Sequence, residues 1–216
     1  MPYIKHLSGD KKLKSLIKQH GEFILRKRKN ICLRLCAHIM SQQLSTKVAD
    51  IIYKRFLNLF DGKPPIPEQI LSVKHETLRS IGLSNAKAGY IHNITRFAVE
   101  NGIDERKLHN LSNDEIISYL TQIKGVGRWT VEMLLMFTLA RPDVFALDDY
   151  GIQIAMQKLY GIKKNDRKKM KEKMLMISEK WKPYRTYACL HLWRWKDGGL
   201  SPGFSPKEKR GKKLNG

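Results

Sequence analysis

Cysteine is scarce in this sequence of 216 residues, which contains only Cys32, Cys36 and Cys189. The three cysteines form no C-x-x-C pair and no four-ligand spacing, which excludes a cysteine-based zinc site or iron–sulfur cluster. They also form no complete disulfide framework, so we expect a reduced, intracellular setting. The seven histidines are scattered without ligand spacing, and no side-chain metal centre is expected.

Long apolar runs are also missing. No uninterrupted run reaches the ~18 residues that a membrane helix needs, and the N-terminus has no apolar signal-peptide core. We therefore expect no membrane partner. Hydrophobic residues still make up 42% of the chain, which excludes a disordered basic tail protein and allows one folded unit over residues 1–216.

Acidic residues are few beside the basic ones. The chain has 20 Asp and Glu against 41 Lys and Arg, which gives a formal net charge of +21. Because a basic surface releases counterions from phosphates, this surplus favours nucleic acid as the partner. Ribosomal RNA, an acidic membrane face or simple solubility are the alternatives on charge alone. We interpret the basic runs at 163–169 and 207–213 as solvated surface.

Period-two alternation is absent over any long stretch, and apolar residues recur instead at helical spacing. Examples are Cys32, Cys36 and Met40; Val48, Ile52, Phe56 and Phe60; Ile91, Ile94 and Ala98; and Met170, Met174, Ile177 and Trp181. Ser112 and Glu115 have the spacing of a capping box, and glycine or proline falls where helices should end. The sequence predicts an all-α protein of about ten short helices.

The most informative segment runs from Leu120 to Thr130. A helix ends at Ile123, the glycines Gly125 and Gly127 flank Val126, and an apolar helix begins at once. Two helices joined this tightly need glycine, because the backbone must turn where a Cβ would clash. The spacing therefore predicts a helix–hairpin–helix.

The start of the second helix of this hairpin has the properties of an anion site. Its unpaired N–H groups and positive dipole end attract a phosphate, and the missing side chains let the phosphate approach the backbone. Lys124 and Arg128 add charge on either side, and Thr130 follows within the first turn. In so basic a chain, DNA backbone binding is favoured over a plain helix connection.

The hairpin resembles that of the helix-hairpin-helix DNA glycosylases, and three further segments match in the right order. Residues 143–152 (DVFALDDYGI) look like the family's catalytic loop, and residues 41–49 (SQQLSTKVA) resemble its DNA-probing segment. Residues 181–194 are similar to the closing helix of the alkylated-base branch, the 3-methyladenine-DNA glycosylase II type. The resemblance implies a two-lobed helical fold with a cleft between the lobes. We expect one lobe at roughly 1–40 plus 121–216, and the other at roughly 41–120.

The resemblance assigns catalysis to Asp149. Breaking an N-glycosidic bond builds positive charge on the sugar, and a carboxylate in a dry cleft stabilises that charge and takes a proton from the attacking water. Spacing alone does not separate Asp149 from Asp148, because either carboxylate is suited to cap the helix that begins near Tyr150.

The resemblance also predicts a base pocket. Trp129 occupies the position at which members that cut the DNA backbone carry a Schiff-base lysine, so a monofunctional enzyme is expected. Trp129 and Trp193 match aromatic walls that suit a cationic alkylated base. Met133 replaces a third aromatic wall, and we interpret Trp195 as a core residue.

Two further sets of residues follow from the resemblance. Gln43 is expected to probe the duplex, with Leu83 or Asn85 as the wedge, although Leu83 also fits a packing role between helices. The backbone carbonyls of Thr121, Ile123 and Val126 are expected to hold a sodium or potassium ion against the phosphate. No other cofactor is expected.

Together these features predict a monomeric DNA glycosylase that flips an alkylated purine out of damaged double-stranded DNA and hydrolyses its glycosidic bond. The expected location is the cytoplasm or nucleoid, or the nucleus in a eukaryote. Two alternatives stay open. One is a glycosylase of the same fold for hypoxanthine, an oxidised base or a mismatched base, and the other is a non-enzymatic DNA-binding protein that uses the hairpin alone.

Overall fold

The structure is a computed structural model that describes residues 1–103 and 105–198. Over these residues the fold contains thirteen helices and no strand, which confirms the all-α prediction. The helices are α1 (Pro2–Leu7), α2 (Lys11–His20), α3 (Ile31–Ser41), α4 (Thr46–Asn58), α5 (Pro67–Leu71), α6 (His75–Ser80), α7 (Asn85–Asn101), α8 (Glu105–His109), α9 (Asn113–Leu120), α10 (Arg128–Phe137), α11 (Tyr150–Tyr160), α12 (Arg167–Glu179) and α13 (Arg185–Lys196). None of the helices in this part of the chain is long and apolar enough to cross a membrane. The basic run at 207–213 lies outside the described residues.

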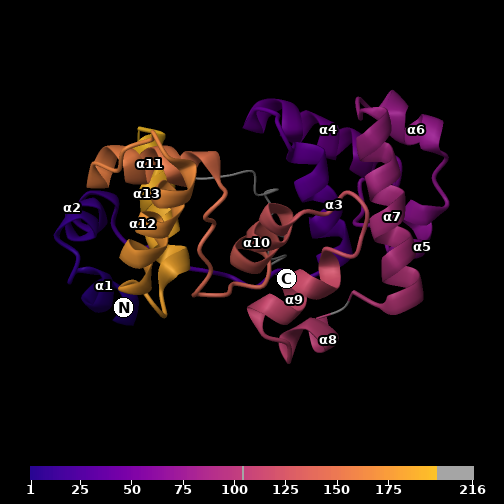
Figure 1. The fold of residues 1–216 in the computed structure, drawn as a ribbon. Helices are drawn as coiled ribbons and strands as arrows, with labels where there is room; N and C mark the ends of the chain where they lie inside the picture. Colours follow the sequence, from indigo (N-terminus) through magenta and orange to yellow (C-terminus); the bar gives the residue numbers. More distant parts are fainter. Residues whose placement is uncertain (104, 199–216) are drawn as a thin grey trace, which may run out of the picture.

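The helices form two groups (Figure 1). The end lobe contains α1, α2 and α11–α13, with α13 packed against both α2 and α11. The middle lobe contains α3–α10, with α3 packed against α4, α7 and α10. The first and the last described helices, α1 and α13, therefore share a lobe. A stack of the Tyr3 and Tyr187 rings, with centroids 3.9 Å apart, joins α1 to α13.

The packing differs from the expected lobe boundary at α3 and α10. The expected boundary places both segments in the lobe of the chain ends. In the structure, α3 contacts α4 and α7, and α10 contacts α3 and α9. The reason is visible in α3, whose residues 31–40 are all buried. A helix that is buried on all sides needs cover on every side, so α3 forms the centre of the middle lobe.

The chain crosses between the lobes along two segments, residues 21–30 and 138–149. These crossings are tied to each other, because the Arg28 N–H donates to the Thr138 carbonyl at 2.9 Å. The paired crossings limit how the lobes rotate relative to one another.

Local signals in the sequence decide the helix starts. The capping box is present as predicted: the Ser112 hydroxyl accepts from the Glu115 N–H at 3.2 Å, and the Glu115 carboxylate accepts from the Ser112 N–H at 2.7 Å. In α4, Ile52 and Phe56 are buried as their spacing predicts. Val48 in the same series is 42% exposed, because no helix covers the first turn of α4 on that side.

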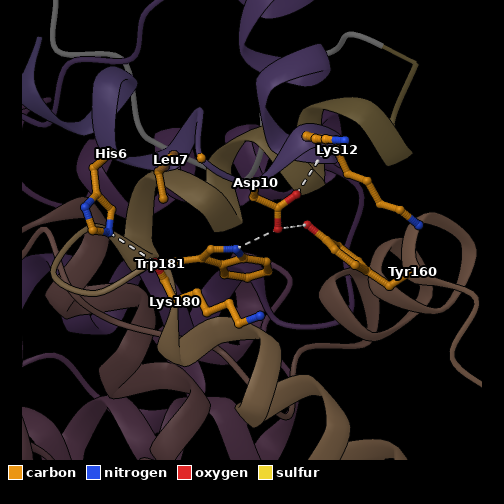
Figure 2. A pocket seen from close by; sticks show the side chains of 9 residues that line it. His6, Leu7, Asp10, Lys12, Tyr160, Lys180 and Trp181 are labelled. Carbon is orange, nitrogen blue, oxygen red and sulfur yellow. Dashed lines mark hydrogen bonds between the residues drawn. The ribbon is translucent and has the colours of Figure 1, made fainter.

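The end lobe is fastened by one carboxylate, that of Asp10 (Figure 2). Its Oδ1 caps α2 by accepting from the N–H groups of Lys12 and Leu13, at 2.9 and 3.2 Å. Its Oδ2 accepts from the Tyr160 hydroxyl at 2.8 Å and from the Trp181 indole Nε1–H at 3.2 Å. Burial raises the pKa of the Tyr160 phenol, and the hydrogen bond to Asp10 raises it further, so the phenol is a donor here. Asp10 thus joins α2 to the ends of α11 and α12.

Replacing Asp10 with alanine is expected to destabilise the protein strongly. The change removes the cap of α2 and leaves the Tyr160 hydroxyl and the buried Trp181 N–H without their acceptor. We expect the free energy of unfolding to fall by about 2–4 kcal/mol, measured by urea denaturation. The control Tyr160→Phe removes one of these bonds and should cost about 1 kcal/mol. Equal losses in the two variants would contradict the central role of Asp10.

Candidate active site

The carboxylate of Asp149 lies where the two lobes meet. Its Oδ1 accepts from the Ile152 N–H at 2.8 Å and from the Trp193 Nε1–H at 2.8 Å. Its Oδ2 accepts from the Trp129 Nε1–H at 2.9 Å. Trp129 belongs to α10 of the middle lobe and Trp193 to α13 of the end lobe. One half-buried carboxylate therefore joins three elements and both lobes.

The two adjacent aspartates have different surroundings. Asp149 is the N-cap of α11, and its side chain also contacts the two indoles. Asp148 is exposed and pairs with Lys171 of α12. The structure thus gives the capping position to Asp149. Capping uses Oδ1, and the same hydrogen bonds that cap the helix also fix the orientation of the carboxylate.

Gly151 makes room for this arrangement. A Cβ at this position would lie 3.0 Å from Asp149 Oδ1, 3.1 Å from Trp193 Cδ1 and 3.0 Å from Lys196 Cε. Any larger residue would press on both the carboxylate and the indole. Sequence reasoning did not single out Gly151, because its backbone conformation is helical and only the tertiary contacts require glycine.

Apolar side chains continue from the carboxylate along one face of α10. Trp129, Met133 and Phe137 follow one another at four-residue spacing, which places them on the same side of the helix. Met133 is buried, and Trp129 and Phe137 are half-buried. The Phe137 ring lies 5.9 Å from the Trp193 ring at an angle of 34°. Sequence reasoning missed Phe137, although its spacing from Trp129 was a signal for it.

The loop that carries Asp149 is pinned to the start of α13. Arg185 donates from Nε and Nη2 to the two carboxylate oxygens of Asp143, at 2.7 and 2.9 Å. The Thr186 hydroxyl accepts from the Val144 N–H at 3.0 Å and donates to the Arg141 carbonyl at 2.7 Å. These contacts fix the loop at residues 141–144, ahead of the Asp149 carboxylate. None of them was expected from the sequence, since the partners lie more than forty positions apart.

The hairpin has the two glycines for different reasons. Gly125 has a φ of +100°, and a Cβ there would lie 2.2 Å from the ring of Tyr90. Gly127 has a φ of −90° and caps α10, and its missing Cβ would meet nothing within 4 Å. The turn itself therefore requires Gly125. Gly127 instead leaves open space in front of the first N–H groups of α10.

The charged residues of the hairpin lie at its surface. Lys124 and Arg128 are both exposed. The Arg128 guanidinium donates from Nε to Glu132 Oε1 at 3.0 Å, and its Nη2 lies 3.9 Å from Asp114 Oδ1. Val126, between the two glycines, is buried.

The expected role of Thr130 in DNA contact needs correction. Its side chain is 2% exposed, and its hydroxyl accepts from the Gln42 Nε2–H at 3.0 Å. A buried hydroxyl with this partner is not available to a DNA phosphate. Thr130 instead joins the first turn of α10 to the end of α3.

The segment expected to probe DNA begins directly after α3. Gln43 is exposed and has a left-handed φ of +57°, which is uncommon for a residue with a side chain. The ammonium group of Lys87 supports the segment by donating to the carbonyls of Met40 and Gln42, at 3.1 and 2.7 Å. Burial lowers the pKa of Lys87. Sequence reasoning missed this support, because Lys87 lies on α7.

The two candidate wedges differ in exposure. Leu83 is 5% exposed and packs in the hydrophobic core, so the expectation of a wedge at Leu83 is wrong and its alternative packing role holds. Asn85 is exposed at the start of α7, and its Oδ1 lies 2.9 Å from His75 Nε2. Burial of Leu83 was decided by the turn before α7, which directs its side chain inward.

Comparison with known proteins identifies the class. Residues 36–183 match the HhH-GPD superfamily of base excision DNA repair proteins. The match covers more than half of the chain, and the chain belongs to this family.

Particular relatives are similar over most of their length. The chain is 37% identical to DNA-3-methyladenine glycosylase 1 of Schizosaccharomyces pombe, over 88% of this chain and 84% of that protein. A solved structure of the S. pombe 3-methyladenine DNA glycosylase Mag1 in complex with abasic DNA matches with a TM-score of 0.81 and 34% identity, covering 91% of this chain and 97% of that one. The DNA-3-methyladenine glycosidase of Bacillus halodurans matches with a TM-score of 0.78 and 36% identity, covering 91% and 89%.

Alanine at the two hairpin glycines should have unequal effects on stability. Gly125→Ala places a Cβ 2.2 Å from the Tyr90 ring in a left-handed backbone, so we expect a loss of about 2 kcal/mol or more. Gly127→Ala meets no atom, and only its effect as a helix cap, about 1 kcal/mol or less, is expected. Thermal unfolding of both variants checks this. A Gly127 variant less stable than the Gly125 variant would contradict the assignment.

Proposed function

We propose that this protein is a DNA glycosylase that removes an alkylated purine, of the 3-methyladenine type, from damaged double-stranded DNA. The observation that carries the proposal is the Asp149 carboxylate, held between the lobes by two indole N–H groups in a chain of net charge +21. The family and the names of the relatives agree with it.

The chemistry is a hydrolysis that leaves an abasic site. The bond between C1′ of the deoxyribose and the base nitrogen breaks, and the base departs with the bonding electrons. A base that already carries positive charge leaves as a neutral molecule, so no strong general acid is needed. Water forms the new bond to C1′ and gives a proton to the carboxylate of Asp149. The same carboxylate offsets the positive charge on the sugar in the transition state.

The indoles have two tasks in this proposal. Through their N–H groups, Trp129 and Trp193 hold the carboxylate of Asp149 in one orientation. Through its ring face the half-buried Trp129 stacks against the everted base, whose positive charge is attracted to an electron-rich indole by about 1–2 kcal/mol. Trp193 is buried next to Phe137 and contributes mainly through its N–H. Met133 lies one turn after Trp129 and completes the wall with a softer side chain.

The hairpin holds the DNA backbone. The open N–H groups after Gly127 and the positive end of α10 bind a phosphate, with Lys124 and Arg128 beside them. A monovalent cation fits the same hairpin. Among the described residues no backbone hydrogen bond of the turns and loops reaches the carbonyls of Thr121 or Val126. The carbonyl of Ile123 accepts only from the Val126 N–H. These three oxygens would hold the ion and bring its charge to the phosphate.

Base flipping needs groups that enter the duplex where the nucleotide leaves it. Gln43 and Asn85 are exposed and suited to this task, one after α3 and the other at the start of α7. The protein acts as a monomer on damaged duplex DNA. It works where the chromosome lies, in the cytoplasm or nucleoid or in a nucleus, and its three buried free cysteines suit such a reducing compartment.

Asp149→Asn should abolish base release and leave DNA binding intact. Removing the negative charge removes the offset to the sugar cation, so we expect the single-turnover rate to fall by roughly 10³-fold. Affinity for duplex DNA should stay within about twofold, since binding rests on the hairpin and basic surface. Asp148→Asn is the control and should keep its activity, because Asp148 pairs with Lys171 at the surface. Full activity of the Asp149 variant would exclude the proposed mechanism, and an inactive wild-type protein that binds DNA would indicate a non-enzymatic module.

The base specificity is tested with four duplexes, which carry 3-methyladenine, 7-methylguanine, hypoxanthine or ethenoadenine. We expect the cationic 3-methyladenine and 7-methylguanine to be released faster than the two neutral bases, because a cation both stacks on indole and leaves readily. Chromatography of the released base measures each rate. Faster release of hypoxanthine would assign the protein to a different lesion.

The enzyme should cut no DNA strand. Trp129 stands where a Schiff-base lysine would be needed, and its N–H is committed to Asp149. We expect no nicking of an abasic duplex and no covalent protein–DNA complex after borohydride treatment. Gel electrophoresis under denaturing conditions measures both. A trapped complex would reveal a lysine nucleophile and overturn the monofunctional assignment.

A further inference from the structure

A second carboxyl group is buried on α10, three residues after Trp129, whose indole N–H donates to Asp149. Glu132 is in α10, one turn after Arg128, and is only 3% exposed. Its Oε1 accepts from Arg128 Nε at 3.0 Å. Its Oε2 is buried and has no hydrogen-bond partner among the described residues. Buried carboxyl groups are normally fully hydrogen-bonded, so this half-satisfied group is unusual.

The surroundings of Glu132 are rich in negative charge. The Asp148 and Asp149 carboxylates of the loop before α11 both raise the pKa of Glu132, whereas Arg128 on its own helix lowers it. The charge of Glu132 also raises the pKa of the Cys189 thiol in α13. Burial is the main cause and raises this pKa to about 12, so the thiol stays neutral. Arg128 is the cation in contact with the Glu132 carboxyl, whereas Asp148 is paired with Lys171.

Ionising this group is costly for the fold. Burial, which outweighs Arg128, raises the pKa of Glu132 from 4.5 to about 7. A buried carboxylate with only one partner is unfavourable, and an amide or apolar side chain would fill the space at less cost.

We propose that Glu132 is a positioning residue of the active site. Its carboxyl anchors Arg128 in the first turn of α10 and, when charged, adds a negative charge near Asp149 that helps to offset the cation on the deoxyribose. This inference rests on the proposed function. A role in the transition state explains why a carboxyl group whose charged form destabilises the fold is buried at this position.

The proposal predicts how base release depends on pH. Glu132 is charged above about pH 7 and neutral below it, so the rate should fall as the pH is lowered from 8 to 6. Glu132→Gln keeps the size of the side chain and an oxygen that accepts from Arg128, but it removes the charge. At an effective dielectric constant near 20, one charge about 12 Å from the sugar cation changes the rate by roughly tenfold. We expect the variant to be about tenfold slower at pH 8 and within about twofold of the wild type at pH 6, where only roughly a tenth of the Glu132 carboxyls are charged.

The measurement is single-turnover release of methylated base from duplex DNA, with the protein at saturating concentration between pH 6 and 8. Because both proteins act on the same substrate, titration of the substrate cancels in the ratio of their rates. The control is Asp114→Asn, which removes the exposed partner of the same Arg128 and should leave the pH profile unchanged. A Glu132 variant with the wild-type profile, at any absolute rate, overturns the proposal.

A second measurement tests the charge without using activity. The unfolded chain loses the Glu132 proton near pH 4.5, whereas the folded protein retains it to about pH 7. Glu132 therefore costs stability that grows as the pH rises from 4.5 to 7 and stays constant above it. The Tm of Glu132→Gln minus that of the wild type should be larger at pH 8 than at pH 5. An equal difference at both pH values overturns the proposal.

The two failures are distinguishable. If the wild-type protein releases no base from alkylated DNA at any pH, the proposed function fails, whatever the Tm comparison gives. If base is released but the pH profile is the same with and without the Glu132 carboxyl, the proposed function stands and the role of Glu132 is rejected.

Discussion

The structure depends on one carboxylate that accepts hydrogen bonds from both lobes. The end lobe supplies the Trp193 indole and the first turn of α11, and the middle lobe supplies the Trp129 indole. The lobes must therefore keep a fixed distance at this point, and the paired crossings at Arg28 and Thr138 support the same geometry. The room left by Gly151 and the clamp between Asp143 and Arg185 serve to keep the carboxylate in place.

A comparison with Asp10 shows why position matters more than local chemistry. Asp10 and Asp149 are both half-buried N-caps, and both accept from an indole N–H. Asp10 joins helices of one lobe, where its hydrogen bonds add to stability. Asp149 lies between the lobes, where a substrate bound to both would meet it. Glu132 is a second example of position deciding the role of a carboxyl group. In our proposal its charge lowers the stability of the fold but serves the reaction at Asp149.

Much of the fold was predictable because local rules decided it. Helical spacing gave the helices, and the Ser112 capping box and the turn at Gly125 lie where the sequence indicated. The candidate Asp149 came from a family resemblance rather than from spacing. Leu83 and Thr130 were misjudged for one reason: only the packing around α7 and α10 shows that their side chains are buried.

The sequence by itself determined that the chain is helical, basic and built around a glycine hairpin, because helix periodicity, net charge and turn geometry are properties of neighbouring residues. Only the tertiary structure decided that α3 is the centre of the middle lobe, that Lys87 supports the segment before Gln43, and that Glu132 is buried. These facts depend on contacts between residues far apart in the chain, and burial, which sets the energy of a charge, has no local signature in the sequence.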